Sequence, residues 1–177
     1  MCWGQFVRLC GVLAALVTVV ACASQSENVA CTQRDWYELG RRDGAQGASM
    51  DRMAALKQEC GGSFSSDWET VYVNGRNAGL VDYCAPENGY ELGRSGIAYL
   101  YVCPSTIEPT FLNSYRRGQE ARQLELKQKE LDARIDSLTD QLDKASTRFE
   151  RTRLADELNQ LQRLRARNER ELTRVSK

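Results

Sequence analysis

Apolar side chains recur every three or four positions in the last third of the chain, with charged side chains between them. The clearest run has spacings of 4, 3, 4, 3 and 4 and consists of Leu131, Ile135, Leu138, Leu142, Ala145 and Phe149. This is the heptad pattern of a helix that packs along a narrow seam. After a phase slip between residues 149 and 154, a more polar run follows at Leu158, Leu161, Arg165, Asn168, Leu172 and Val175. The pattern predicts a long charged helix over residues 113–177.

Residues 114–175 contain no proline and one glycine, Gly118. We therefore expect an unbroken helix of about 60 residues, whose seam needs a partner helix to cover it. The favoured partner is a second copy, in a parallel coiled-coil dimer or trimer, or else another envelope protein. Two alternatives remain. One is a hairpin that turns within residues 146–153, where no Gly, Pro or Asn marks a turn, and the other is a single solvated helix held by charge pairs.

A four-fold repeat precedes this helix. With seven tyrosines and thirteen glycines in 177 residues, chance predicts about half a Tyr-x-x-Gly (7 × 13/177), whereas four stand out between residues 36 and 120. Residues spaced by three lie on one face of a helix, and repeated glycine there costs about 1 kcal/mol each unless a neighbouring helix approaches closely. Helices are therefore favoured over the strand alternative suggested by Ala98–Val102. The repeat residues are Tyr37, Gly40, Tyr72, Gly75, Tyr90, Gly93, Tyr115 and Gly118.

Arginine follows the glycine in the first three repeats, at Arg41, Arg76 and Arg94. We expect these cations to pair with nearby carboxylates on a solvated helix face, such as Asp43, Asp82 and Glu91. A receptor for anions is the less favoured alternative. Trp36 and Trp68 each follow an aspartate, as an aromatic does when it enters the core after an N-cap. Stacking of these indoles on a sugar ring is a minority interpretation.

The first residues have the pattern of an export signal. Arg8 is followed by an apolar run without charge to Ala21, which is too short for a comfortable membrane span of roughly 20 residues. The sequence Val19-Val20-Ala21-Cys22 then resembles the lipobox of bacterial lipoproteins. This resemblance implies removal of a signal peptide, residues 1–21, and a diacylglycerol and a further acyl chain, such as palmitate, on Cys22. Alternatives are an ordinary cleaved signal and an uncleaved anchor.

Ala23 follows the lipobox cysteine where an aspartate would signal retention, so the same resemblance favours the outer membrane, with the protein facing the periplasm. Several acyl chains on one residue anchor a protein stably, whereas one chain gives only marginal binding. Residues 22–30 would then form a lipidated polar tether. No cofactor beyond the covalent lipid on Cys22 is expected.

Four cysteines remain after the leader and the lipidated residue, at Cys31, Cys60, Cys84 and Cys103. An even number in an exported domain of this size indicates two disulfides. Their spacings of 29, 24 and 19 include no CxxC pair, so a metal site is the weaker alternative. If Cys84 and Cys103 end two successive antiparallel helices, they lie about 20 Å apart, so this pairing is disfavoured. The predicted fold class is all-α, with a small disulfide-stapled bundle of short helices over residues 31–112 and the long helix after it.

The order of these residues resembles a family of small proteobacterial lipoproteins known only as a domain of unknown function. The resemblance covers about residues 31–120 and implies a lipoprotein with a helical domain marked by Gly and Cys, but no activity or catalytic residue. It rests on Cys31, Asp35, Trp36, Tyr37, Gly40, Asp43, Gly44, Gly47, Cys60, Tyr72, Gly75, Arg76, Gly79, Leu80, Tyr83, Cys84, Gly93, Gly96, Tyr99 and Cys103.

Composition narrows the function further. The chain contains no histidine, which removes the commonest general base and zinc ligand, and no catalytic motif stands out. Residues 22–115 carry a net charge of −5 and residues 116–177 one of +4, too little for a nucleic-acid binder. We expect no enzyme and no metal site, but a structural or adaptor lipoprotein that acts through its coiled coil. The alternative is a module whose Tyr/Trp/Arg repeats bind peptidoglycan or another glycan, and a hydrolase is least expected.

Overall fold

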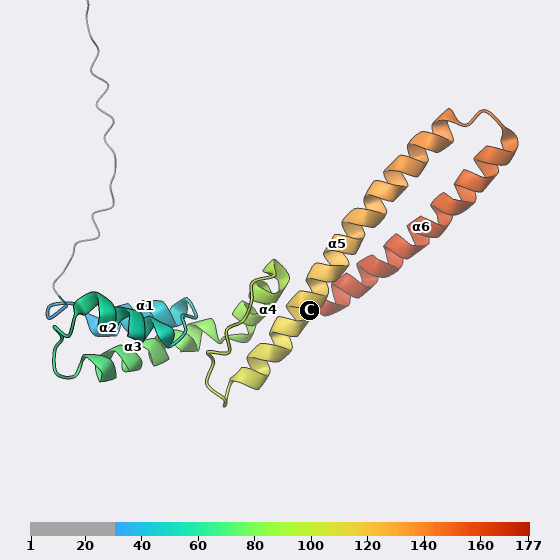
Figure 1. The fold of residues 1–177 in the computed structure, drawn as a ribbon. Coiled ribbons are helices and arrows are strands. Elements are labelled where there is room, and N and C mark those ends of the chain that lie inside the picture. The colour runs from blue at the N-terminus through green and yellow to red at the C-terminus, as the bar shows by residue number, and fades with distance from the viewer. Residues whose placement is uncertain (1–30) are drawn as a thin grey trace, which may run out of the picture.

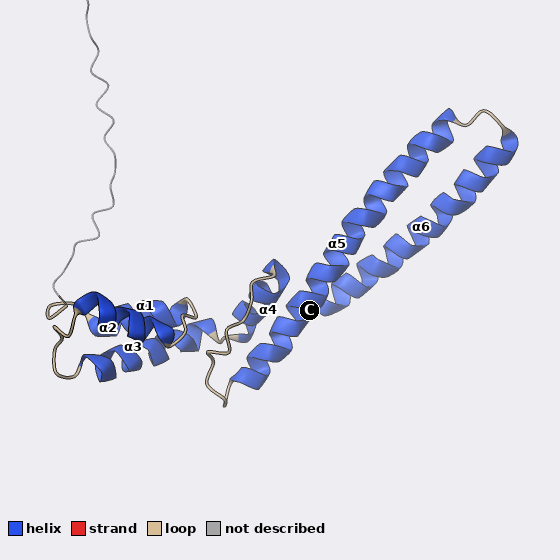
Figure 2. Ribbon diagram, in the orientation of Figure 1, coloured by secondary structure: helices blue, strands red, loops and turns tan. Residues whose placement is uncertain are grey.

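The computed structural model describes residues 31–177, and all its regular elements in this range are helices (Figures 1 and 2). The prediction of an all-α fold is confirmed. The predictions of a signal peptide over residues 1–21, a tether over residues 22–30 and a lipid on Cys22 lie outside the described residues. None of the described helices is both long and apolar enough to cross a bilayer. The elements are α1 (Trp36–Ala45), α2 (Asp51–Cys60), α3 (Trp68–Tyr83), α4 (Pro86–Ser95), α5 (Glu108–Lys144) and α6 (Arg148–Val175).

Helices α1, α2 and α3 form one end of an elongated molecule (Figure 1). Asp35 starts α1, because its carboxylate accepts a hydrogen bond of 2.9 Å from the backbone N–H of Glu38. Trp36 and Trp68 enter the core behind their aspartates, as predicted, although the Asp67 side chain makes no capping bond. The core of this end consists of Trp36, Leu56, Cys60, Trp68 and Tyr72.

Helix α4 packs along the first third of α5, and the end of α3 joins their core. Pro86 lies in the first turn of α4, where its missing N–H has no intrahelical partner to lose. The fully buried ring of Phe111 on α5 lies at the centre of this core. Its other buried members are Leu80, Tyr83, Cys84, Tyr99 and Cys103.

The expected unbroken helix is wrong, because the chain turns between Lys144 and Arg148 and α6 folds back along α5 (Figure 1). Thr147 caps α6 by accepting a hydrogen bond of 3.2 Å from the N–H of Glu150. Arg151 Nε closes the turn with a bond of 2.9 Å to the carbonyl of Ala145. A threonine N-cap was therefore the turn signal, in a segment without Gly, Pro or Asn.

The hairpin buries its own seam. Leu131, Leu138 and Ala145 of the first run meet Leu154 and Leu161 of the second, so the phase slip is where the two runs begin to face each other. A parallel dimer is not needed to cover these side chains. The last member of the predicted first run, Phe149, is 81% exposed at the tip of the hairpin and packs in no seam.

Asn168 is a buried polar residue in this seam, with 4% of its surface exposed. Its Nδ2 donates to the carbonyl of Leu124 and to Oε1 of Gln128, each at 2.9 Å. Its Oδ1 has no partner among the described residues. A buried amide that bonds only in one alignment fixes the register of two helices, so Asn168 sets how α6 lies against α5.

Two disulfides join neighbouring cysteines, Cys31 to Cys60 and Cys84 to Cys103. The prediction of two disulfides is confirmed, but the argument against Cys84–Cys103 is wrong. It assumed that each cysteine ends a helix, whereas α4 stops at Ser95 and residues 96–107 run back without helical structure. This return brings Cys103 to within a Cα–Cα distance of 5.7 Å of Cys84.

The hairpin makes a prediction about two apolar residues of α6 that lie five positions apart. Leu154→Ala should lower the free energy of unfolding by between about 2 and 5 kcal/mol, because it opens a cavity in the seam. Phe149→Ala, at the exposed tip, should change it by less than about 0.5 kcal/mol. Urea denaturation followed by circular dichroism measures both. Equal effects of the two substitutions would contradict the hairpin and favour the continuous seam.

Candidate functional site: glycine crossings and an exposed tyrosine loop

The four repeats meet in pairs. Repeats one and two cross where α1 packs on α3, and a Cβ added to Gly40 would collide with the carbonyl oxygen of Tyr72. Reciprocally, a Cβ on Gly75 would collide with the carbonyl oxygen of Tyr37. Both contacts lie well inside the 3.0 Å that real Cβ atoms essentially never show. The two backbones therefore touch directly, and only glycine permits it.

Repeats three and four cross in the same manner where α4 packs on α5. Gly93 faces the carbonyl oxygen of Tyr115, and Gly118 faces that of Tyr90. The tyrosine of each repeat thus supplies its carbonyl to the glycine of its partner repeat. Cα–H···O contacts are characteristic of helix backbones that approach each other this closely. The predicted close approach is confirmed for Gly40, Gly75, Gly93 and Gly118.

Two further glycines extend the first crossing by one helical turn. Gly44 lies against the carbonyl of Arg76, and Gly79 against that of Arg41, one helical turn beyond the first pair of contacts. Gly96, the second glycine of the third repeat, has a different role. It ends α4 with a φ of 75°, a left-handed conformation that suits a helix C-cap.

The tyrosine rings do not share one role. Tyr72 is fully buried and donates from its hydroxyl to Asp43 at 2.8 Å, whereas Tyr37 is 45% exposed. Tyr115 donates to the carbonyl of Ile97, and Tyr90 to the hydroxyl of Ser176 near the end of the chain. The shared feature of the repeats is therefore the backbone contact at the glycine, whereas the tyrosine rings have different burial and different hydrogen-bond partners.

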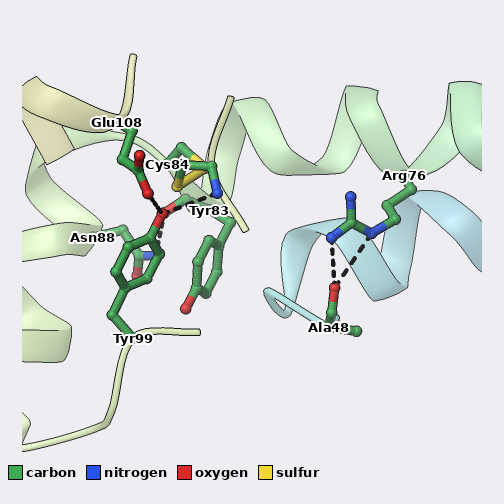
Figure 3. Close-up of a disulfide and its surroundings, with 8 residues drawn as sticks. Ala48, Arg76, Tyr83, Cys84, Asn88, Tyr99 and Glu108 are labelled. Carbon is green, nitrogen blue, oxygen red and sulfur yellow. Dashed lines mark hydrogen bonds between the residues drawn. A yellow bond between two sulfur atoms is a disulfide. The ribbon is translucent and has the colours of Figure 1, made fainter. Parts of the chain in front are cut away.

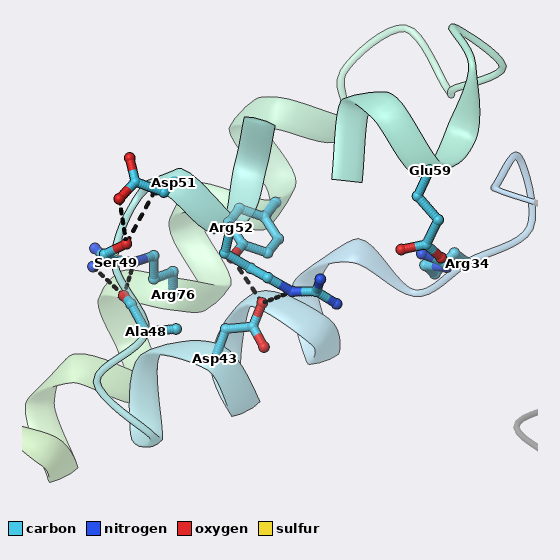
Figure 4. A network of polar contacts seen from close by, with 9 residues as sticks. Arg34, Asp43, Ala48, Ser49, Asp51, Arg52, Glu59 and Arg76 are labelled. Atoms are coloured by element: carbon cyan, nitrogen blue, oxygen red, sulfur yellow. Dashed lines mark hydrogen bonds and ion pairs between the residues drawn. The ribbon is translucent and has the colours of Figure 1, made fainter. Parts of the chain in front are cut away.

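The arginines after the glycines do not pair with the predicted carboxylates. Arg76 is 6% exposed and donates from Nε and Nη2 to the carbonyl of Ala48, at 3.3 and 2.8 Å (Figure 4). Arg41 pairs with Glu38, and Arg94 with Glu125 of α5. Packing between segments, which the sequence does not display, decided the partners of Arg76 and Arg94. Arg41 does pair with a nearby carboxylate on its own helix face, but with Glu38, three residues before it. Arg76 braces the α1–α2 loop and is not open to an outside anion.

The loop that follows α4 is held from inside by Tyr99. Its hydroxyl donates to Glu108 at 2.8 Å and accepts from the N–H of Cys103 at 3.0 Å (Figure 3). Burial raises the pKa of Tyr99 to about 12, the Glu108 carboxylate adds to the rise, and the Cys103 N–H opposes it. Burial and the bond to Asp43 also raise the pKa of Tyr72. Both phenols are neutral structural donors.

The same loop exposes large side chains at Ile97, Leu100 and Tyr101, and Tyr101 is 77% exposed. Tyr101 is also the only non-glycine residue among residues 31–177 with a positive φ, 56°. A left-handed conformation costs an L-residue roughly 1–2 kcal/mol. Sequence reasoning missed this loop, because Ala98–Val102 alternates like a strand and no local signal predicts a left-handed tyrosine.

A groove of about 320 Å³ runs between this loop and α5. Its lining consists of Ala98, Tyr99, Tyr101, Leu112, Tyr115, Arg116 and Gln119. Trp36 and Trp68, in contrast, are buried, so neither indole can stack on a sugar. No group of three or more metal-binding side chains occurs among residues 31–177.

Residues 35–120 match the sequence model of a family described as "Protein of unknown function (DUF2799)". This match spans both glycine crossings and ends just after the fourth repeat, before the hairpin. No curated protein and no solved structure matches the chain. The similarity therefore supports the domain with the four repeats and brings no activity with it.

The crossing makes a prediction for glycine substitutions. Gly75→Ala should destabilise the protein by at least about 2 kcal/mol, since two helix backbones must separate to admit a methyl group. Gly61→Ala is the matched control, because Gly61 has open space around it but a φ of 56°, so its cost should stay near 1 kcal/mol. Thermal and urea unfolding compare the two variants. A Gly75→Ala protein as stable as the control would contradict the backbone contact.

The raised pKa of Tyr99 makes a prediction about alkaline stability. Between pH 10 and about 12 the unfolded chain releases a proton that the folded chain keeps. Stability from this phenol is thus fully present below pH 10 and is lost as the pH rises toward 12. Urea midpoints at pH 9, 10 and 11 should fall less steeply in Tyr99→Phe than in the parent. Tyr37→Phe, at an exposed ring, is the control, and identical slopes in both variants would contradict the prediction.

Proposed function

We propose that the protein is an outer-membrane lipoprotein that faces the periplasm and acts as a structural or adaptor protein through its C-terminal hairpin. The support for the anchor is the charged start, the apolar run and the lipobox-like sequence that ends at Cys22. The only bound group that this proposal requires is the covalent lipid. The partner we propose is another envelope protein.

The observation that carries the adaptor proposal is the continuity of α5. This helix contributes Tyr115 and Gly118 to the second crossing and then continues to Lys144 as one strut of the hairpin. Its 37 residues extend about 55 Å at 1.5 Å per residue. Because no linker lies between domain and hairpin, the hairpin is a rigid extension of the repeat domain.

The base of the hairpin is fixed as well. Arg117 of α5 donates to the carbonyl of Val175 at 3.1 Å, and Arg174 of α6 lies 3.5 Å from the carboxylate of Glu120. Such exposed pairs contribute little individually, but together they hold the end of α6 against the domain. An arm that is fixed at its base and long relative to its domain suits a protein that positions a partner.

The burial of the seam changes where that partner would bind. The side chains expected to join a second copy are already covered by α6, so a partner contacts outward-facing residues. Phe149 at the tip is the most exposed large apolar side chain among the described residues. An exposed aromatic at the end of a rigid arm is the kind of residue that anchors a contact.

We propose no catalytic activity. All four described cysteines are in disulfides, so none supplies a thiol nucleophile, and the chain has no histidine to act as a general base.

The adaptor proposal predicts site-specific crosslinking in cells. A photoreactive phenylalanine at position 149 should give one discrete adduct with an envelope protein, because the tip meets the partner. The same group at Leu126, exposed on the side of the same arm, should give no such adduct. Gel shifts and mass spectrometry identify the products.

Cys22→Ser is the control for the anchor. It should move the protein from the membrane fraction to the soluble fraction and abolish the adduct at position 149. Equal adducts at positions 149 and 126 would contradict the adaptor role of the tip. Membrane fractionation that does not depend on Cys22 would contradict the lipid anchor.

A further inference from the structure

In the loop between α4 and α5, Tyr101 has both a strained backbone conformation, with a positive φ, and an exposed aromatic ring. Tyrosine rings are normally at least partly buried in a folded protein. A backbone position with a positive φ is normally occupied by glycine. At position 101 both tendencies are violated together. Persisting strain and an uncovered ring in one residue are features of a ligand contact.

The surroundings hold Tyr101 in place. Cys103, two residues later, is linked to Cys84 at the end of α3. The Tyr115 hydroxyl bonds to the carbonyl of Ile97 at 2.8 Å and ties the start of the loop to α5. The Tyr101 ring packs at a tilt against Tyr99, with ring centroids 5.0 Å apart. The exposed ring is therefore presented by a fixed loop, and a preorganised contact loses little entropy on binding.

The opposite wall of the groove carries charge. Arg116 and Gln119 of α5 face it and are exposed. Within residues 31–177 no carboxylate lies within 4.0 Å of the Arg116 guanidinium, and no Asp or Glu lines the groove. The groove thus combines an open aromatic face, an unpaired cation and an amide. Its charge is complementary to an anion.

We infer that this groove binds a sugar unit that carries a carboxylate, within a glycan chain. The C–H face of a pyranose is weakly positive and stacks on the negative face of an aromatic ring, here Tyr101. Arg116 forms a charge-assisted bond with the carboxylate, and Gln119 bonds to hydroxyl or amide groups. The groove volume of about 320 Å³ lies at the lower end of the roughly 300–1,000 Å³ of small-ligand sites, which suits one or two sugar rings.

This site differs from the repeat aromatics that the sequence suggested for a glycan. Trp36, Trp68 and Tyr72 are committed to the core, and Arg76 is committed to Ala48. The groove lies at the base of the hairpin beside the second crossing, far along the chain from the tip residue Phe149. Glycan binding is therefore independent of the adaptor role proposed for the tip.

The test uses the full-length protein and isothermal titration with three probes: an oligogalacturonate tetramer, neutral chitotetraose and hexaglutamate. We expect saturable binding of the acidic saccharide and at least about tenfold weaker binding of the other two, since each lacks one of the two contacts. Tyr101→Gly, which removes both ring and strain, and Arg116→Gln should each weaken acidic saccharide binding at least about tenfold.

Two exposed residues of the hairpin provide matched controls. Phe149→Ala removes an exposed aromatic and Arg163→Gln removes an exposed cation, and both should bind the acidic saccharide like the parent. Circular dichroism verifies that every variant is folded. The inference is overturned if the acidic saccharide does not bind the folded parent, if Tyr101→Gly and Arg116→Gln bind it as the parent does, or if hexaglutamate binds equally well.

Discussion

Direct contact between helix backbones organises this protein. At each of the two crossings, a tyrosine carbonyl on one helix lies against a glycine on the other, and the contact is made reciprocally. Where helices approach so closely, backbone atoms rather than side chains form the contact. The position of one helix relative to the other can then change little without a clash. The α1–α3 and α4–α5 pairs follow from this contact, and so do the cores that flank them. Any residue with a side chain at those four glycines would separate the helices.

The second crossing also determines the direction of the hairpin. Because Gly118 fixes α5 against α4, the rest of α5 must leave the domain along a single axis (Figure 1). Helix α6 then returns along that axis and ends against α5 and Tyr90 of α4. A motif of two residues thus controls the placement of about sixty residues after it. The groove at Tyr101 lies between the same helix and the loop that precedes it, so it shares this fixed frame.

Several features could be predicted from the sequence because they depend on local periodicity. The helical fold, the close approach at the glycines, two disulfides and the apolar seam all follow from spacing and residue type. The partners of Arg76 and Arg94 could not, because they depend on which segment packs against the helix, whereas Arg41 pairs within α1 with Glu38, three residues before it. The turn before Thr147 was predicted only as a less favoured alternative, because its only signal is one capping hydroxyl. The left-handed Tyr101 had no signal at all, since its conformation is imposed by Cys103, Tyr99 and Tyr115 around it.

The two disulfides join each cysteine to its neighbour in the sequence, the first to the second and the third to the fourth. Of the three pairings possible for four cysteines, this is the one in which each loop closes within its own helical unit. A chain oxidised progressively from its N-terminus reaches this pairing without breaking any earlier bond. The order of the cysteines therefore matches the order in which they leave the N-terminal end of the chain, so oxidation in that order gives the native pairing directly.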